Sequence, residues 1–260
     1  MRIIRRLRSA PQILGGLRSP VAVLLLCTLF LCAACSQPEI QSLSVNTPPW
    51  RAGEVSVYQI TDSTGAAAGT TTYAITKGDA QNNAAGWTIQ REIAAQGIHE
   101  LLIVQVDADD LRPSASLLTR TSSRGKELVK AAYTLDGVDI EMTSVLNVTT
   151  NQHIAVPSDA RVEATVLPLL RALPLAANYA TRLNSFSPAT GLLDRVTVQV
   201  VKAEEVTVPA GAFATWQVEL DTGASKTRAW IGRDAPNPLV KYVDGQSQGT
   251  FELSEYKPGE

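Results

Sequence analysis

The six residues RVTVQV at positions 195–200 alternate strictly between polar side chains and valine. Because successive side chains of a β-strand point to opposite faces, this pattern predicts a strand with one face in a core and the other in water. Similar runs predict further strands at 55–60, 72–75, 87–89, 102–106, 215–222, 227–231, 239–242 and 250–253. Most of the chain beyond residue 50 is therefore expected to be β-sheet.

Turn signals lie between these runs. The clearest is Asp136-Gly137, which separates residues 133–135 from residues 138–140 and predicts a tight hairpin. The close spacing of strands and turns favours an antiparallel meander. The sequence shows no repeat of fixed period and no internal linker, so we expect a single β-rich domain over residues 51–260.

One segment breaks the strand pattern. Ser158 can cap a helix that begins at the next residue and turns Val162 and Val166 to one apolar face. Pro168 and Pro174 are expected to keep this helix short or divided. We expect the helix to close one end of the sheet.

The N-terminal segment has the pattern of an export signal. Residues 1–34 contain five arginines and no acidic residue, and residues 21–34 form an uncharged apolar run. A membrane-spanning helix needs about 20 apolar residues, so the run is too short to span a bilayer. A buried helix is the alternative, but the basic stretch before the run and the polar stretch after it favour a secretory signal.

The end of the apolar run, CAACS at residues 32–36, resembles the lipobox of bacterial lipoproteins. The resemblance implies cleavage between Ala34 and Cys35 and a diacylglyceryl group on the Cys35 sulfur. Cys27 and Cys32 each follow a leucine, which is too large for that position, although a lipobox usually has an aliphatic residue where Cys32 stands. The implied partner is a membrane, either the cell membrane or the outer membrane, with the protein on the extracytoplasmic side.

Residues 1–34 are thus expected to be a signal peptide, and residues 35–50 a lipidated cysteine and a flexible tether. Removal of the five arginines changes the net charge from −2 to −7, which argues against a nucleic-acid partner. Only Cys35 remains of the three cysteines, so no disulfide within the chain is expected.

A second resemblance lies in the last third of the chain. The string VPAGAF at residues 208–213 precedes Trp216, Trp230 and PNPLVKY at residues 236–242, and it resembles a family of bacterial envelope proteins whose shared domain has no assigned function. The resemblance implies a single, strongly curved antiparallel sheet, a β-roll or open barrel. It implies no catalytic residues. The string also has a simple structural interpretation as a corner, in which Pro209 ends a strand and Gly211 permits the turn.

No pattern in the sequence predicts a catalytic site, a metal site or a cofactor. His99 lies at an expected turn or strand start and His153 at an expected turn, and DADD at residues 107–110 lacks the glycine of a calcium loop. We therefore expect a lipid-anchored, non-enzymatic binding or structural module whose partner is another envelope protein. The alternative is a carrier or sensor of an apolar ligand inside the curved sheet. Its candidate lining residues are Val162, Val166, Leu170, Leu173, Phe213, Trp216 and Trp230.

Overall fold

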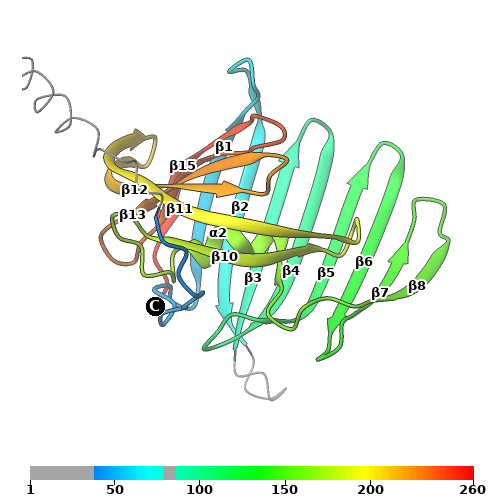
Figure 1. Cartoon of the computed structure of the whole chain (residues 1–260). Coiled ribbons are helices and arrows are strands. Elements are labelled where there is room, and N and C mark those ends of the chain that lie inside the picture. Colours follow the sequence, from blue (N-terminus) through cyan, green and yellow to red (C-terminus); the bar gives the residue numbers. More distant parts are fainter. Residues whose placement is uncertain (1–37, 79–85) are drawn as a thin grey trace, which may run out of the picture. The chain divides into compact units, whose positions relative to one another are not determined.

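A single sheet of fifteen strands dominates the computed structural model, which describes residues 38–78 and 86–260 (Figure 1). The expected signal peptide, its cleavage site after Ala34 and the lipidation site Cys35 lie outside the described residues. Residues 38–260 form one compact unit. Within the described residues, no helix has both the length and the hydropathy needed to span a membrane.

The N-terminal half supplies eight strands. They are β1 Glu54–Thr61, β2 Ala67–Lys77, β3 Gly86–Ala95, β4 Ile98–Asp107, β5 Pro113–Ser122, β6 Gly125–Tyr133, β7 Val138–Thr143 and β8 Thr149–Ile154. The rest of the chain supplies a short helical segment and seven strands. They are β9 Arg161–Val162, the 3-10 helix η2 Glu163–Thr165, α2 Val166–Leu170, β10 Ala180–Ser187, β11 Leu192–Val208, β12 Gly211–Asp221, β13 Lys226–Gly232, β14 Leu239–Val243 and β15 Thr250–Lys257.

The first and last strands pair with each other in the middle of the sheet. The spatial order runs from β8 through β1, then β15, and on to β9. All neighbouring strands are antiparallel except β9 and β10, which pair in parallel over two residues. The prediction of an all-β fold with a single, curved, open antiparallel sheet and one short helix is confirmed.

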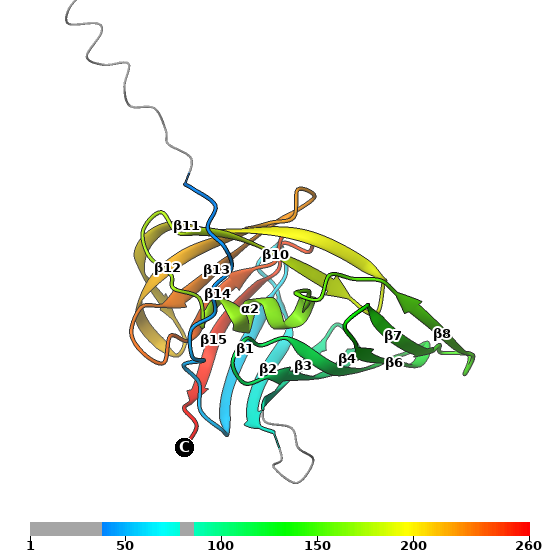
Figure 2. The same ribbon diagram turned by 60° about the horizontal axis from the view of Figure 1, so that its bottom comes forward.

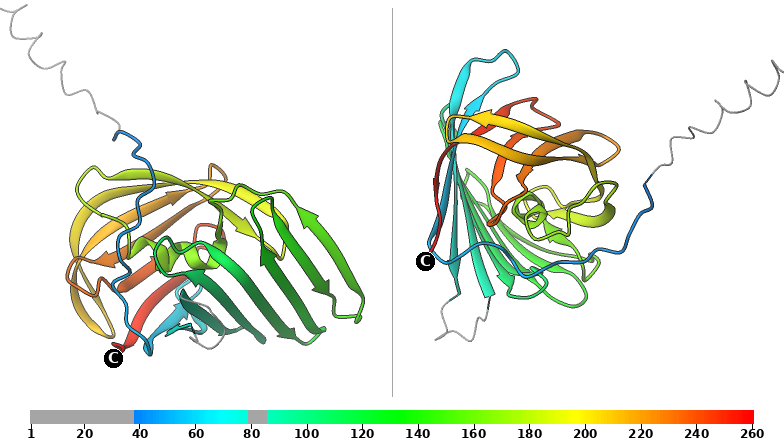
Figure 3. Two further views of the ribbon diagram at one scale, coloured as in Figure 1. Left: turned by 90° about the horizontal axis from the view of Figure 1, so that it is seen from below. Right: turned by 90° about the vertical axis from the view of Figure 1, so that its left-hand side faces the viewer.

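The sheet curves around α2, which lies on its inner side (Figures 2 and 3). Val196, Val198 and Val200 of β11 are buried on the inner face, while the residues between them are more exposed, as their alternation predicts. The expected hairpin at Asp136-Gly137 is also present, between β6 and β7. The inner faces of both halves of the sheet share one large hydrophobic cluster with α2.

The helix starts later than the sequence predicts, so that prediction is corrected. Arg161 and Val162 pair with β10 as strand β9, and helical geometry begins only at Glu163. Ser158 therefore caps no helix, and neither η2 nor α2 has a side-chain cap. The exposed edge of β10 offers hydrogen bonds that compete with a first helical turn. Val162 and Val166 are nevertheless buried, as expected.

Part of the expected tether is also corrected. Residues 41–50, which we name the strap, lie against the folded body rather than apart from it (Figure 2, blue). The Gln41 amide donates to the Ala180 carbonyl at 2.8 Å, and the Asn46 amide donates to the Ala172 carbonyl at 2.7 Å. Trp50, at the end of the strap, is 3% exposed. This docking could not be predicted from the sequence, because the residues of the strap show no periodic hydrophobic pattern. The strap nevertheless carries apolar side chains that pack on the core.

A buried ion pair holds the end of α2 in place. Arg171, which follows α2, contacts both carboxylate oxygens of Glu54 on β1, at 2.5 and 3.1 Å. Its guanidinium also donates to the carbonyls of Pro236 and Asn237, and it lies 5.5 Å from the Trp50 ring centroid. Burial and the Glu54 carboxylate raise the pKa of Tyr256 to about 12, so its hydroxyl remains a donor to Glu54. The network ties α2, the strap and the two central strands together.

The VPAGAF string forms the hairpin corner that its structural interpretation predicts. β11 ends at Val208, β12 begins at Gly211, and Gly211 has a φ of 131°, which favours glycine. Phe213 and Trp216 are half-buried at the margin of the core. Trp216 lies within β12 rather than at its start, since the strand begins immediately after the corner.

Candidate functional site

A cavity of about 300 Å³ lies on the inner side of the sheet, beside η2 and α2. We name it the inner cavity. Its walls come from both halves of the sheet, since Tyr73 lies on β2, Arg91 on β3 and Tyr242 on β14. Glu163 and Leu167 form the wall on the helical side. The curvature of the sheet therefore brings together residues that are far apart in the sequence.

The walls of the inner cavity combine apolar and polar side chains. Tyr73 and Tyr242 belong to a cluster of aromatic rings, in which Tyr242 stacks on Phe251 with ring centroids 4.1 Å apart. Tyr58 lies behind them and contacts both tyrosine rings edge to face. Aliphatic side chains also line the cavity, namely Ile93, Val166, Leu167, Val196 and Leu220. Neutral polar side chains lie among them, namely Ser185, Thr222, Ser225, Thr227, Gln246 and Ser247.

Two residues of the lining, Tyr73 and Arg91, each have a polar atom that is buried beneath the cavity surface. The Tyr73 hydroxyl and the Arg91 Nε are both inaccessible to water and make no hydrogen bond. The two residues face each other in register across β2 and β3, which places their side chains side by side. Burial raises the pKa of Tyr73, although Arg91 opposes this, and the group remains a neutral hydroxyl.

The charge of Arg91 is already balanced. Its Nη2 lies 2.7 Å from Glu100, and Arg120 contacts the other oxygen of the same carboxylate at 2.8 Å. Burial acts to raise the pKa of Glu100, but the two guanidinium groups outweigh it and hold this pKa below its usual value. This charge cluster borders a smaller cavity of about 70 Å³ that shares Arg91, Glu163 and Ala164 with the inner cavity.

The solvent side of the inner cavity is acidic. Glu163 and Asp194 are exposed residues of its lining, and Asp244 lies beside them. Asp244 accepts hydrogen bonds from the backbone and hydroxyl of Ser247, so it also shapes the turn at this rim. The lining thus combines acidic side chains on the solvent side with a mixture of apolar and neutral polar side chains.

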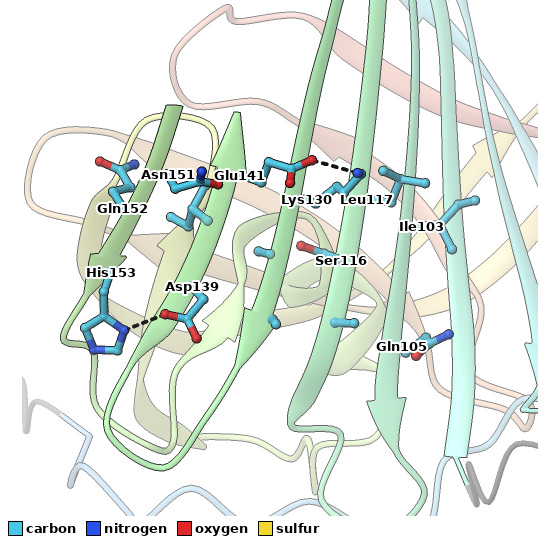
Figure 4. A pocket seen from close by; sticks show the side chains of 14 residues that line it. Ile103, Gln105, Ser116, Leu117, Lys130, Asp139, Glu141, Asn151, Gln152 and His153 are labelled. Carbon is cyan, nitrogen blue, oxygen red and sulfur yellow. Dashed lines mark hydrogen bonds and ion pairs between the residues drawn. The ribbon is translucent and has the colours of Figure 1, made fainter. Parts of the chain in front are cut away.

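A second hollow lies on the outer face of β4 to β8, and we name it the outer trough (Figure 4). Its volume is about 790 Å³. Ala115 and Ala132 face each other across β5 and β6, and their short side chains leave a depression beside Ile103 and Leu117. These residues point away from the inner cavity, because their strand neighbours, such as Val104 and Ser116, face the core.

Two cross-strand ion pairs lie in the outer trough, and Figure 4 shows both. Lys130 contacts Glu141 at 2.7 Å, and His153 Nδ1 contacts Asp139 at 2.8 Å. The hydrogen bond with Asp139 raises the pKa of His153. The trough is therefore an apolar depression flanked by paired charges at the β8 edge of the sheet.

Two of the seven candidate lining residues belong to the two cavities described above. Val166 lines the inner cavity and Val162 lines the smaller one. Leu170 and Leu173 are buried in the core beside α2. Trp230 points to the opposite face of β13 from Ala229 and Ile231, and its indole nitrogen donates to Glu204 at 2.8 Å. Phe213 and Trp216 lie at the core margin, where Arg233 covers the Trp216 ring.

The histidines and acidic residues occupy strands and turns. His99 lies at the start of β4, one of its two expected positions, and pairs with Glu92 at 2.7 Å. His153 lies on β8 rather than in the expected turn. Asp107 ends β4 and accepts the amides of Asp109 and Asp110, which makes DADD a charged turn. Across residues 38–78 and 86–260, no group of three or more His, Cys, Asp or Glu side chains could hold a metal ion.

Sequence reasoning missed the two central residues of the inner cavity, Tyr73 and Arg91. A usable signal was present for Arg91, since Ile89, Arg91 and Ile93 alternate on one strand face. A charged side chain between two inward isoleucines requires either a buried partner or a cavity. Tyr73 lies in a stretch rich in Gly, Ala and Thr, where the strand register is weakly specified by pattern.

The comparisons with known proteins concern the family and the fold. A family model described as a protein of unknown function, DUF3108, matches residues 56–251. No curated protein matches the chain. A beta-barrel-like protein of the domain of unknown function DUF1849 from Brucella abortus has a similar fold, with a TM-score of 0.56 and 9% identity, over 84% of this chain and 100% of that one.

Two further solved structures are less similar. A candidate exported protein with a YmcC-like fold from Bacteroides fragilis has a TM-score of 0.32 and 11% identity, over 82% of this chain and 100% of its own. A candidate lipoprotein from Parabacteroides distasonis has a TM-score of 0.30 and 14% identity, again over 82% of this chain and 100% of its own.

Proposed function

This chain belongs to the DUF3108 family of proteins of unknown function, and we propose that it is a lipid-anchored cell-envelope protein that acts by binding rather than by catalysis. The proposal places the mature protein on the extracytoplasmic side of a membrane. Its anchor is a lipid on Cys35, and its working part is the curved sheet.

The observation that carries the anchor is the position of Cys35. It follows Ala33 and Ala34 at the end of an apolar run, and the compact unit begins at residue 38. Two or three acyl chains on one cysteine give stable attachment, since each buried CH₂ contributes about 0.8 kcal/mol. Because the strap begins at residue 41, the chain from Cys35 to the strap is about six residues long and can span at most about 20 Å.

Binding is favoured over catalysis by how the chemically active side chains are arranged. His99 and His153 each pair with one carboxylate across neighbouring strands, and both pairs are largely exposed. A catalytic histidine needs an orienting acid on one ring nitrogen and a nucleophile within reach of the other. The inner cavity and the outer trough, by contrast, both have the mixed apolar and polar linings of binding surfaces.

The test of the anchor is metabolic labelling with palmitate in a bacterial host. We expect Cys35→Ala to abolish labelling and to release the protein from the membrane pellet. Cys32→Ala is the matched control, since it removes a neighbouring thiol and should leave labelling unchanged. Labelling that persists in Cys35→Ala would refute the anchor.

A second candidate function is favoured by the inner cavity. We propose as the alternative that the protein carries or senses an apolar ligand held inside the curved sheet. The cavity volume of about 300 Å³ lies at the lower end of the range typical of small-molecule sites, about 300–1,000 Å³. The measurement that separates this candidate from a bare scaffold is ligand binding by the purified protein.

A further inference from the structure

We propose that β8, at one edge of the sheet, binds a second copy of this chain by antiparallel pairing around a two-fold axis at Asn151. The two sheets would then form one continuous sheet. This inference goes beyond the proposed function, since it depends neither on the anchor nor on the inner cavity. It is carried by the state of the two sheet edges, the hydrogen-bonding pattern of β8 and the side chains along it.

The two edges of the sheet are protected to different extents. At one edge, β9 covers two residues of β10 and the strap forms a bridge to Thr181. At the other edge, β8 pairs with β7, and no other strand within residues 38–78 and 86–260 lies against its free side (Figure 1). Proteins usually shield an edge strand with charges, a proline or a β-bulge, because a free edge can pair with another chain. The six residues of β8 contain no proline, and their pairing with β7 is regular.

The chain around β8 also lacks the charges that would keep a second strand away. Residues 142–158 contain no Asp, Glu, Lys or Arg, although these make up 18% of the whole sequence. His153 is the titratable residue of this segment, and Asp139 on β7 pairs with it at 2.8 Å. Like charges directly opposite each other destabilise a strand pair, and this segment would place none opposite itself.

The backbone of β8 fixes the register of the proposed pairing. The Ser144 amide donates to the Val148 carbonyl at 3.0 Å, and hydrogen-bonded pairs alternate along an antiparallel ladder. Even-numbered residues of β8 therefore turn their amides and carbonyls toward β7, and odd-numbered residues turn theirs to the free side. The odd-numbered residues are Thr149, Asn151 and His153. With Asn151 opposite itself in the second copy, these residues face each other, and each pair exchanges two hydrogen bonds.

The side chains are self-complementary in this register. Val148, directly before β8, is 58% exposed and would face Ile154 of the second copy on the inner face of the sheet. Leu146, in the same turn, is 80% exposed and adds apolar surface at this end. Thr150 would face Gln152 of the second copy. Apolar groups therefore meet at both ends and polar groups in the middle, as a two-fold interface requires of a single surface.

The same symmetry is compatible with two anchors in one membrane. A two-fold axis between antiparallel edge strands is perpendicular to the sheet, so both inner faces point to the same side. β10 lies on the inner side, since Phe186 packs with Ala131 and Ile140 of β6 and β7. Gln41, at the start of the strap, binds β10 at Ala180 (Figure 2). The straps of both copies would therefore begin on the same side of the joined sheet.

The experiment uses a soluble protein of residues 36–260, which keeps both hydrophobic clusters and every strand pairing. Sedimentation equilibrium should show a reversible dimer with a dissociation constant in the micromolar range, because one strand pair buries less surface than a standard interface. Hydrogen exchange at the amides of Thr149, Asn151 and His153 should slow as the protein concentration rises. The amides of Thr150 and Gln152 face β7 and should be protected at every concentration, so they are the internal control.

Variants at the two-fold axis test the register. Asn151→Lys and Asn151→Asp each place like charges opposite each other and should weaken dimerisation about fivefold or more. An equimolar mixture of the two variants should dimerise again, since unlike charges then face each other, and this recovery also shows that both variants fold. Thr70→Lys is the matched control, because Thr70 is exposed on β2 and its cross-strand partners Gln59 and Ala94 are uncharged.

A proline gives an independent test. Asn151→Pro removes an amide that faces the free side, so it should abolish dimerisation and keep the pairing with β7. Protein that stays monomeric at millimolar concentration would overturn the self-pairing and leave the edge to a different partner. A dimer that persists in Asn151→Lys and Asn151→Pro, a mixture that fails to recover, or an equal loss in Thr70→Lys would each overturn the proposal. The anchor is tested separately through Cys35.

Discussion

At the scale of single residues, Arg171 and Glu54 form a buried ion pair that is costly to break. Their side chains are 4% and 2% exposed, so neither charge can be solvated if its partner is removed. Arg171 also donates hydrogen bonds to two backbone carbonyls in the loop after β13. An apolar side chain at position 171 could not donate these hydrogen bonds. The pair therefore connects the helical segment to β1 and to that loop through one guanidinium.

We expect Arg171→Met to lower the free energy of unfolding by about 3–5 kcal/mol, because it leaves the Glu54 carboxylate buried with only the Tyr256 hydroxyl. Adding Glu54→Gln to this variant should recover part of the loss, since it removes the stranded charge. Urea unfolding of residues 36–260 measures both effects. Lys130→Met in the exposed Lys130–Glu141 pair is the control and should cost less than about 1 kcal/mol. Equal losses in the two single variants would contradict this account.

At the scale of elements, the strap differs most from its prediction. Its polar residues and prolines are typical of a linker, yet its backbone continues the edge of β10. The Thr181 hydroxyl donates to the Gln41 carbonyl at 2.9 Å, in addition to the amide bond between the same segments. The strap then passes the end of α2 and buries Trp50 edge-on against Trp87. It is therefore a structural element rather than a tether.

We expect the amides of Gln41 and Asn46 to be protected from hydrogen exchange, because each donates to a carbonyl of the body. Thr181→Val should speed exchange at Gln41 about five- to tenfold, the effect of losing about 1 kcal/mol of local stability, and change Asn46 less. Exchange followed by NMR on residues 36–260 measures both amides. Rapid exchange of both amides would mean that residues 41–50 do not dock on the folded body and act as a flexible tether.

The strands and the helical segment also show what could be predicted from sequence. Local alternation located β11 and β12, and Asp136-Gly137 located a hairpin, because these signals depend on neighbouring residues. The start of the helix could not be predicted, since it depends on whether β10 pairs with residues 161–162. The inner cavity could not be predicted either, because Tyr73 and Tyr242 come together only through the pairing of β1 with β15.

At the scale of the whole folded unit, the first and last strands of the chain join the two halves of the open sheet. The chain begins in the middle of the sheet, runs out to β8, crosses to β9 and returns to the middle at β15. Glu54 and Tyr256, which are in contact, are 202 positions apart in the chain. Such a contact forms only after a large loop has closed, which costs conformational entropy and slows folding. The two halves of the sheet therefore depend on one late pairing.

We expect removal of residues 250–260 to abolish cooperative unfolding. The deletion takes away β15, which pairs with both β1 and β14, and it opens the core at Leu253, which is fully buried. The halves β1–β8 and β9–β14 would then be separate sheets with exposed inner faces. Removal of residues 258–260 is the control, since it keeps β15 and loses the hydrogen bond from Glu260 to Ala52.

Urea unfolding followed by circular dichroism and tryptophan fluorescence should show one sharp transition for the control and a broad, early loss of signal for the deletion of residues 250–260. The physical reason is that the inner faces of the two halves bury each other around α2, so neither half has a complete core of its own. A single transition with an unchanged midpoint in the longer deletion would mean that the halves are independently stable. The inner cavity would then not require the central pairing for its shape.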